Sequence, residues 1–274
     1  MRYAICNETF EGWDHRRVCR LVADLGYGGL EIAPFTLAPS ITDVSSERRR
    51  ELRQEAEQCG LKIVGLHWLL AKTEGLHLTS PEETVRKRTA EYLVELARGC
   101  RDLGGELMVF GSPAQRRIPA GVSKAQATEY AADTVQRALP GIADCSIKLC
   151  LEPLPQPDTD FIITCAEGIE LLDRVSHPNF VLHLDVKAMA SDEAPIPELI
   201  RRHAPRTAHF HANDPNKRGP GFGSMDFVPI LRALKETDYR GWVSVEVFDY
   251  SPDPETIARR SIRYMKECAK AAGY

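Results

Sequence analysis

The sequence alternates short β-rich runs with longer helical patterns from one end to the other. Alternation of this kind is typical of repeated βα units around a parallel sheet. Eight such runs are expected to form strands, namely Tyr3–Asn7, Gly29–Ala33, Lys62–His67, Glu106–Gly111, Ile147–Glu152, Phe180–Asp185, Thr207–Ala212 and Val243–Val247.

A helical segment is expected after each of these strands. The clearest predicted helices are Ser46–Gln58, Pro81–Leu103, Lys124–Ala143 and Pro254–Ala271. The first has Ser45 or Ser46 as a suitable N-cap, and Gly60 provides the glycine that commonly follows a helix end. Pro81 lies in the predicted first turn of the second helix, where its missing N–H costs nothing.

Eight βα units in 274 residues, with no low-complexity tract and no linker, favour a closed barrel. We therefore predict the α/β class and a single (β/α)8 TIM barrel that forms one domain over residues 1–274. A doubly wound open sheet is the alternative. The glycines of Gly219–Gly223 do not lie between a strand and its helix as a dinucleotide site requires, which favours the barrel.

Composition excludes several functional classes. The net charge of −4 argues against a nucleic-acid partner, although Arg116–Arg117 and Lys217–Arg218 could form small basic patches. No two of the eight cysteines form a Cys-x-x-Cys pair, so a zinc ribbon is not expected. The N-terminus lacks a secretory pattern, and no apolar run approaches ~20 residues. We expect a cytoplasmic protein without a membrane partner.

The last four predicted strands each end at or near a side chain that can bind metal. These side chains are Glu152, Asp185, His211 and Glu246. Barrel active sites lie at the carboxyl ends of the strands, so the four groups are expected to converge. Three carboxylates in one pocket repel one another unless a cation neutralises them. The sequence therefore predicts one divalent metal ion, with Mn2+ favoured and Mg2+, Co2+ or Zn2+ as alternatives.

Histidines on the same strands form a second group of candidates. His183 and His209 lie two residues before Asp185 and His211, so they share the inward face. They either orient the metal ligands through hydrogen bonds or are interior histidines without a functional role. His67 ends the third predicted strand, and we expect it to contact substrate.

The loop after the seventh predicted strand contains Lys217, Arg218 and the glycines of Gly219–Gly223. Glycines allow a close backbone approach to a ligand, and either cation can hydrogen-bond an oxygen-rich or anionic substrate. We expect Arg218 to bind substrate, together with Lys187 in the loop after the sixth strand.

These motifs resemble the xylose isomerase-like barrel superfamily of sugar isomerases and epimerases, which includes ketose 3-epimerases and hydroxypyruvate isomerases. The resemblance covers essentially the whole chain and is most specific at Leu151-Glu152-Pro153, His183-Leu184-Asp185, His209-Phe210-His211, Gly219–Gly223 and Val245-Glu246. It implies that Glu152, Asp185, His211 and Glu246 bind one divalent metal. It also implies that Glu152 and Glu246 are the catalytic acid and base.

The sequence departs from the ketose epimerase pattern at two positions. A histidine usually follows the metal-binding aspartate by three positions, and this chain has Ala188 there. Lys187 either replaces the lost polar contact or is a solvated loop residue. The usual acid after the glycine loop is Ser224 here. Endonuclease IV, which belongs to the same superfamily, fits less well because Phe110-Gly111-Ser112 supplies no imidazole at the fourth strand end.

The leading hypothesis is a metal-dependent isomerase or epimerase of a sugar or sugar phosphate, acting by proton transfer through an enediolate. Its partner is a small-molecule carbohydrate, and assembly into a homo-oligomer is left open. The altered segment around Lys187 motivates one alternative, a keto-sugar lyase or dehydratase with the same metal site. A barrel that binds sugar without turnover is the other alternative.

Overall fold

Eight parallel strands pair in sequence order, and β8 pairs with β1 to close a barrel. The computed structural model describes residues 1–192 and 194–274. The predicted (β/α)8 barrel is therefore confirmed. The strands are β1 (Arg2–Cys6), β2 (Gly29–Ile32), β3 (Lys62–Leu66), β4 (Leu107–Phe110), β5 (Lys148–Leu151), β6 (Phe180–Asp185), β7 (Thr207–Ala212) and β8 (Trp242–Val245).

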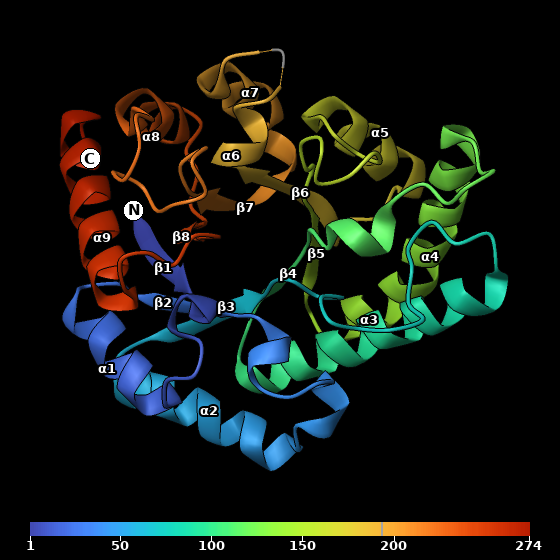
Figure 1. Cartoon of the computed structure of the whole chain (residues 1–274), viewed down its shortest axis with the longest axis horizontal. Coiled ribbons are helices and arrows are strands. Elements are labelled where there is room, and N and C mark those ends of the chain that lie inside the picture. Colours follow the sequence, from blue (N-terminus) through green and yellow to red (C-terminus); the bar gives the residue numbers. More distant parts are fainter. Residues whose placement is uncertain (193) are drawn as a thin grey trace.

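At least one helix follows every strand, and the helices form an outer ring around the barrel (Figure 1). They are α1 (His15–Asp24), α2 (Ser46–Gln58), α3 (Glu83–Leu103), α4 (Lys124–Asp144), α5 (Cys165–Val175), α6 (Val186–Met189), α7 (Ile196–His203), α8 (Phe227–Glu236) and α9 (Pro254–Ala271). Short 3-10 turns in the connections include η1 (Asn7–Phe10), η2 (Pro34–Thr36), η3 (Ile41–Asp43), η4 (Pro113–Arg116) and η5 (Ala204–Arg206).

The predicted boundaries of the eight strands and of the four clearest helices all fall within two residues of the observed ones, and local interactions explain where the helices begin and end. Ser45 caps α2 by accepting from the Arg48 N–H, and Gly60 follows that helix with a φ of +78°. The helix predicted to begin at Pro81 begins instead at Glu83. Ser80 accepts from the Glu82 N–H at 3.2 Å, which forms a turn before the first helical residue.

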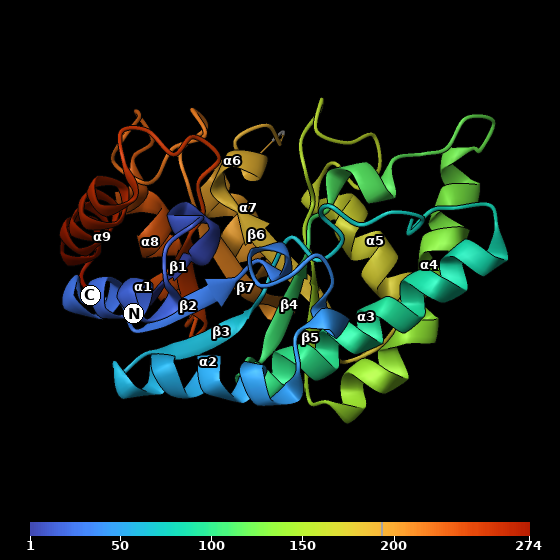
Figure 2. The same ribbon diagram turned by 60° about the horizontal axis from the view of Figure 1, so that its bottom comes forward.

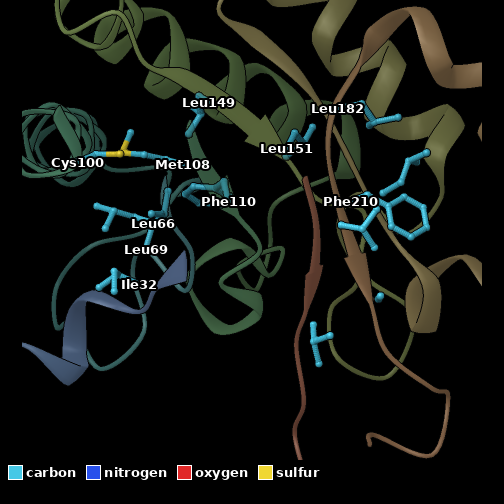
Figure 3. Packing of buried hydrophobic residues seen from close by; sticks show 14 of the residues in the cluster. Ile32, Leu66, Leu69, Cys100, Met108, Phe110, Leu149, Leu151, Leu182 and Phe210 are labelled. Carbon is cyan, nitrogen blue, oxygen red and sulfur yellow. The ribbon is translucent and has the colours of Figure 1, made fainter. Parts of the chain in front are cut away.

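Apolar side chains form two layers, one inside the barrel and one between the barrel and the helices. The inner cluster is small and contains Ala4, Val64, Leu107, Val109, Cys150 and Trp242. Met108 and Phe110 alternate with Leu107 and Val109 on β4 and face outward, where Cys100 of α3 lies nearby (Figure 3). This alternation follows from the two-residue period of a strand, and it leaves the upper interior to polar side chains.

Long connections gather on the side of the barrel where the strands end. In Figure 2 the connections from β5 to α5 and from β7 to α8 rise on the same side of the barrel. Functional side chains of this fold are carried by such loops, because the carboxyl ends of the strands open there. Within the described residues, no helix combines the length and the apolar character that crossing a membrane requires.

Candidate active site

The four predicted metal ligands lie at the carboxyl ends of neighbouring strands, and all are buried. Asp185 is the last residue of β6 and His211 lies within β7, while Glu152 and Glu246 directly follow β5 and β8. The hydrogen bonds between strands continue through these two residues. The Glu152 N–H donates to a carbonyl of β4 at 3.1 Å, and the Glu246 N–H donates to a carbonyl of β7 at 3.3 Å. The backbone therefore holds all four residues rigidly at one rim.

Three of the four predicted ligands fall in one compact group with His183. Ligand atoms of Glu152, Asp185, His211 and His183 lie within 4.8 Å of one another. The register of β6 and β7 explains this grouping, because Asp185 is opposite His211 and His183 is opposite a histidine on β7. Both ring nitrogens of the fully buried His183 lack a hydrogen-bond partner. His183 therefore has a free nitrogen for a ligand.

Asp185 is held by two neighbouring groups. Its Oδ1 accepts from the Ala188 N–H at 2.7 Å, and its Oδ2 accepts from the Asn213 side-chain amide at 2.5 Å. The side-chain Oδ1 of Asn213 accepts from the Lys187 N–H at 2.8 Å. Asn213 therefore fixes the end of β6 to the end of β7. Its residue type alone did not reveal this role.

Glu246 reaches the compact group through His211. Its Oε2 lies 3.0 Å from His211 Nδ1, and its Oε1 lies 3.2 Å from His67 Nδ1. His67 Nε2 lies 2.9 Å from the buried Glu8 of η1. The prediction did not include Glu8, because it follows β1 on a short 3-10 turn without a periodic signal. The result is a buried chain of carboxylate, imidazole and carboxylate.

Glu31 is a second buried acid that sequence reasoning missed. It lies on β2 and is fully buried, with Oε2 2.8 Å from His209 Nε2 and 3.2 Å from His211 Nε2. His209, for which a ligand-orienting role and a purely interior role were both open, therefore contacts Glu31, and Glu31 contacts His211 directly. A charged residue inside an apolar predicted strand was the available signal, because burying an unpaired carboxylate is costly.

Glu152 is accommodated by a glycine and supported by a buried arginine. A Cβ at Gly111, which follows β4, would lie 2.2 Å from Glu152 Oε2. Arg116 is fully buried and donates to the Glu152 carbonyl at 2.6 Å and to the Ile162 carbonyl at 3.1 Å. Its burial corrects the expectation that Arg116–Arg117 forms a basic surface patch. The guanidinium instead holds the β5 end in place.

The carboxyls differ in the direction of their pKa shifts. Burial, with repulsion from Glu246 and Asp185, raises the pKa of Glu152 well above its usual range. Burial and the Glu246 charge raise the pKa of Asp185 to about 6. Burial also tends to raise the pKa of Glu246, but the imidazoles of His211 and His67 outweigh it and lower that pKa to about 2.

These groups fit a divalent cation. Carboxylates with raised pKa values lie beside an imidazole and the unpartnered His183 nitrogens, and a positive charge would remove the repulsion between the acids. The oxygen-rich set with nitrogen donors suits a first-row divalent ion or Mg2+. Glu246 contacts His211 but lies outside the compact group of Glu152, His183, Asp185 and His211. Its carboxylate would be the fourth of the four predicted metal ligands.

A cavity of about 180 Å³ opens over the site. Its lining includes His67, Glu152 and Glu246, and the remaining residues are Trp68, Gly111, Ser112, Pro113, Leu154, Asp158, Lys187, Lys217 and Phe248. The Lys187 ammonium lies 2.7 Å from the Asp158 carboxylate and 5.2 Å from the centre of the Phe248 ring. Lys187 is thus a cavity residue and not a solvated loop residue.

Arg218 does not line this cavity, which argues against its expected role in substrate binding. Its guanidinium donates to Asp249 at 2.8 Å, and the pair is partly exposed. The neighbouring Lys217 lines the cavity instead. Its backbone has a φ of +71°, and its carbonyl accepts from the Phe248 and Asp249 N–H groups. Because of this turn, the side chain of Lys217 lines the cavity and that of Arg218 does not.

The glycine loop packs around a buried acid. Asp214 accepts from the Met225 N–H at 3.1 Å, and a Cβ at Gly223 would lie 2.0 Å from its Oδ1. Ser224, which follows the last glycine of the loop, is exposed and does not line the cavity. Ala188 is buried and contributes only its N–H to Asp185. Gly223 therefore serves packing within the loop, whereas Gly219 and Gly221 allow the loop to approach Ser261 and Tyr264 of α9.

Comparison with known proteins gives a consistent result. The model of the xylose isomerase-like TIM barrel family matches residues 19–268. A D-psicose 3-epimerase of Ruminiclostridium cellulolyticum is 27% identical over 251 residues, covering 90% of this chain and 82% of its own. A putative hydroxypyruvate isomerase of Danio rerio is 30% identical over 222 residues, covering 76% and 77%. The solved structure of an L-ribulose 3-epimerase superposes with a TM-score of 0.86 at 19% identity, covering 99% and 95%.

Proposed function

The chain belongs to the xylose isomerase-like TIM barrel family, and from this premise we propose that it is a sugar isomerase or epimerase. In this proposal it uses one divalent metal ion and transfers protons through an enediolate. The observation that carries the proposal is the meeting of Glu152, Asp185 and His211 at one rim, beside a cavity that Glu246 also lines. The names of the relatives support the substrate class, a small carbohydrate.

The proposed ligands of the cation are Glu152, Asp185, His211 and Glu246, and Mn2+ is the favoured ion. When bound, the cation supplies electrostatic stabilisation of the negative charge that develops on a substrate oxygen. Asn213 and Glu31 orient this set, because they contact Asp185 and His211 directly.

Glu152 and Glu246 are the proposed acid and base. Both line the cavity from different strands, so they can face a bound sugar from two directions. Their pKa values shift in opposite directions, which suits one group for donating a proton and the other for accepting one. Return of the proton to the opposite face of the carbon gives epimerisation, and return to the neighbouring carbon gives isomerisation.

His67 positions Glu246 in this proposal, because its ring lies between the carboxylates of Glu8 and Glu246. It also lines the cavity, so the proposal keeps a contact between its ring and the substrate, although both ring nitrogens already contact carboxylates. Lys187 and Lys217 offer ammonium groups to substrate oxygens on the side of the cavity formed after β6 and β7.

The proposal is tested by solvent-deuterium exchange over a panel of keto- and aldo-sugars, free and phosphorylated. We expect at least one sugar to gain deuterium beside its carbonyl at unchanged chemical composition. Glu246→Gln is expected to slow this exchange at least about 100-fold, since a positioned base contributes roughly that much. Glu236→Gln is the control, because Glu236 is half exposed and forms an ion pair with Arg201 on the surface. Deuterium exchange at the wild-type rate in Glu246→Gln would show that Glu246 is not the catalytic base.

Product masses separate the two remaining hypotheses. A lyase or dehydratase releases water or another group, whereas isomerisation preserves the mass apart from deuterium. Sugar binding without any exchange over the panel identifies a non-catalytic barrel.

A further inference from the structure

A second hollow, of about 400 Å³, lies beside the cavity over the candidate active site. Trp68 and Pro113 line both, so the two spaces adjoin along these side chains. The other residues around the second hollow are Glu11, Phe35, Ala71, Lys72, Ala114, Gln115 and Tyr250. None of these seven lines the first cavity.

The second hollow opens on the same face as the proposed reaction site. Glu11, Phe35 and Trp68 follow β1, β2 and β3, and Ala114 and Tyr250 follow β4 and β8. Five connections from carboxyl strand ends therefore meet around it. This is the face on which barrels of this kind bind their substrates.

Aromatic side chains dominate its surface. Phe35 and Trp68 are half-buried, and the Tyr250 side chain is 43% exposed. Among the described residues, the other large apolar side chains this exposed are the two terminal residues of the sequence. Exposed aromatic groups at one place mark a binding surface, because their flat faces stack with other apolar faces.

The charged residues at this hollow are already paired with each other. The Lys72 ammonium lies 3.6 Å from the Glu11 carboxylate and 4.1 Å from the centre of the Phe35 ring. They form a polar rim and leave the aromatic surface to a ligand. An anionic or cationic ligand would compete with this pair, whereas a neutral apolar group would not.

Trp68 connects the two spaces and is held in an unusual conformation. Its φ is +53°, in the left-handed region that a bulky residue rarely adopts. Its ring packs edge-on against Phe248, which lines the first cavity, with centroids 6.1 Å apart. The surrounding structure therefore fixes the indole between the two spaces, as is common at ligand-binding positions.

We propose that the second hollow is a substituent subsite, and that the substrate is an aryl glycoside bearing a carbonyl on its sugar ring. The sugar occupies the first cavity, and the planar aglycone stacks on Phe35, Trp68 and Tyr250. An apolar cavity of about 150 Å³ holds a benzene ring, so the second hollow has room for a phenyl or a fused bicyclic group. This inference rests on the proposed function, because it extends the substrate of that site.

The test is calorimetric binding of matched glycosides to the purified full chain with Mn2+ present. Phenyl and methyl glycosides of glucose, galactose and mannose, each oxidised to a ring ketone at the same position, form three pairs that differ only in the aglycone. For at least one sugar, the phenyl glycoside is expected to bind about tenfold more tightly than the methyl glycoside. Phe35→Ala and Tyr250→Ala should remove this difference and leave the affinity for the methyl glycoside unchanged. Phe222→Ala, which changes an aromatic residue outside both hollows, should preserve the difference.

The assignment is overturned if no phenyl glycoside binds more than twofold more tightly than its methyl partner. It is also overturned if the preference survives both Phe35→Ala and Tyr250→Ala, or if disaccharides bind more tightly than the phenyl glycosides. Binding does not require turnover. If the protein prefers the phenyl glycosides but exchanges no deuterium into any sugar, the proposed reaction is contradicted and the proposed subsite is not.

Discussion

Gly111→Ala is the sharpest perturbation of the candidate site, because it changes one hydrogen to a methyl group beside a single carboxylate. The new Cβ would lie 2.2 Å from Glu152 Oε2, whereas ordinary van der Waals contacts begin at 3.4 Å. The carboxylate must therefore move by about 1.2 Å. The φ of Gly111 is not positive, so the backbone there accepts alanine.

The expected consequence is a large loss of activity in a folded protein. A displacement of about 1 Å at a reacting group costs roughly 100-fold in rate. Because the clash involves a side chain that can rotate, the free energy of unfolding should fall by no more than the ~1–3 kcal/mol typical of overpacking. Metal affinity should also fall, since Glu152 is a proposed ligand.

The assay combines deuterium exchange, metal titration and thermal unfolding on the same preparation. Gly28→Ala is the matched control, because its Cβ would have its nearest neighbour, Trp242, at 3.4 Å and lies before β2 at the opposite end of the barrel. If Gly111→Ala exchanges deuterium at the wild-type rate, the Glu152 carboxylate does not need its present position, and its proposed role is refuted.

Three further predictions follow from the same contacts. The affinity for Mn2+ should rise at least about tenfold per pH unit through pH 6 and continue to rise above it, because a cation must displace the protons retained on Asp185, Glu152 and His211; calorimetry at several pH values checks this, and a flat profile contradicts it. Arg116→Met should lower the free energy of unfolding by about 2 kcal/mol, because it leaves the buried Glu152 carbonyl unpaired and removes one of the two donors to the Ile162 carbonyl. The exposed Arg117→Met should cost less than about 1 kcal/mol, and equal losses in denaturant titrations would contradict this. Lys217→Met should raise KM about tenfold and Arg218→Met less than about twofold, because Lys217 lines the cavity and Arg218 does not. A larger rise in KM for Arg218→Met than for Lys217→Met in steady-state kinetics would contradict this.

The barrel and its rim were predictable because local patterns encode them. Short apolar runs that end in acids determine strand positions, and parallel closure brings the strand ends together without information about tertiary contacts. Glu152, Asp185 and His211 were found in this way. The exact boundaries were less certain, as with Pro81, because a local turn at Ser80 decides where α3 begins.

The supporting residues were not predictable in the same way. Glu31 contacts His209 across 178 positions of sequence, so only the closed barrel reveals that its charge is paired. Arg116 belongs to a pair of basic residues that could have formed a surface patch, and its burial depends on two carbonyls of the distant connection between β5 and α5. The choice between Lys217 and Arg218 depends on one backbone turn at Lys217, which sequence periodicity does not describe.

The most direct test of the central claim is metal content measured alongside deuterium exchange in one preparation. The account predicts about one equivalent of divalent metal per chain, loss of exchange on chelation, recovery with added Mn2+, and weakened binding in Asp185→Asn. Exchange that continues at the full rate in the chelated protein would contradict it.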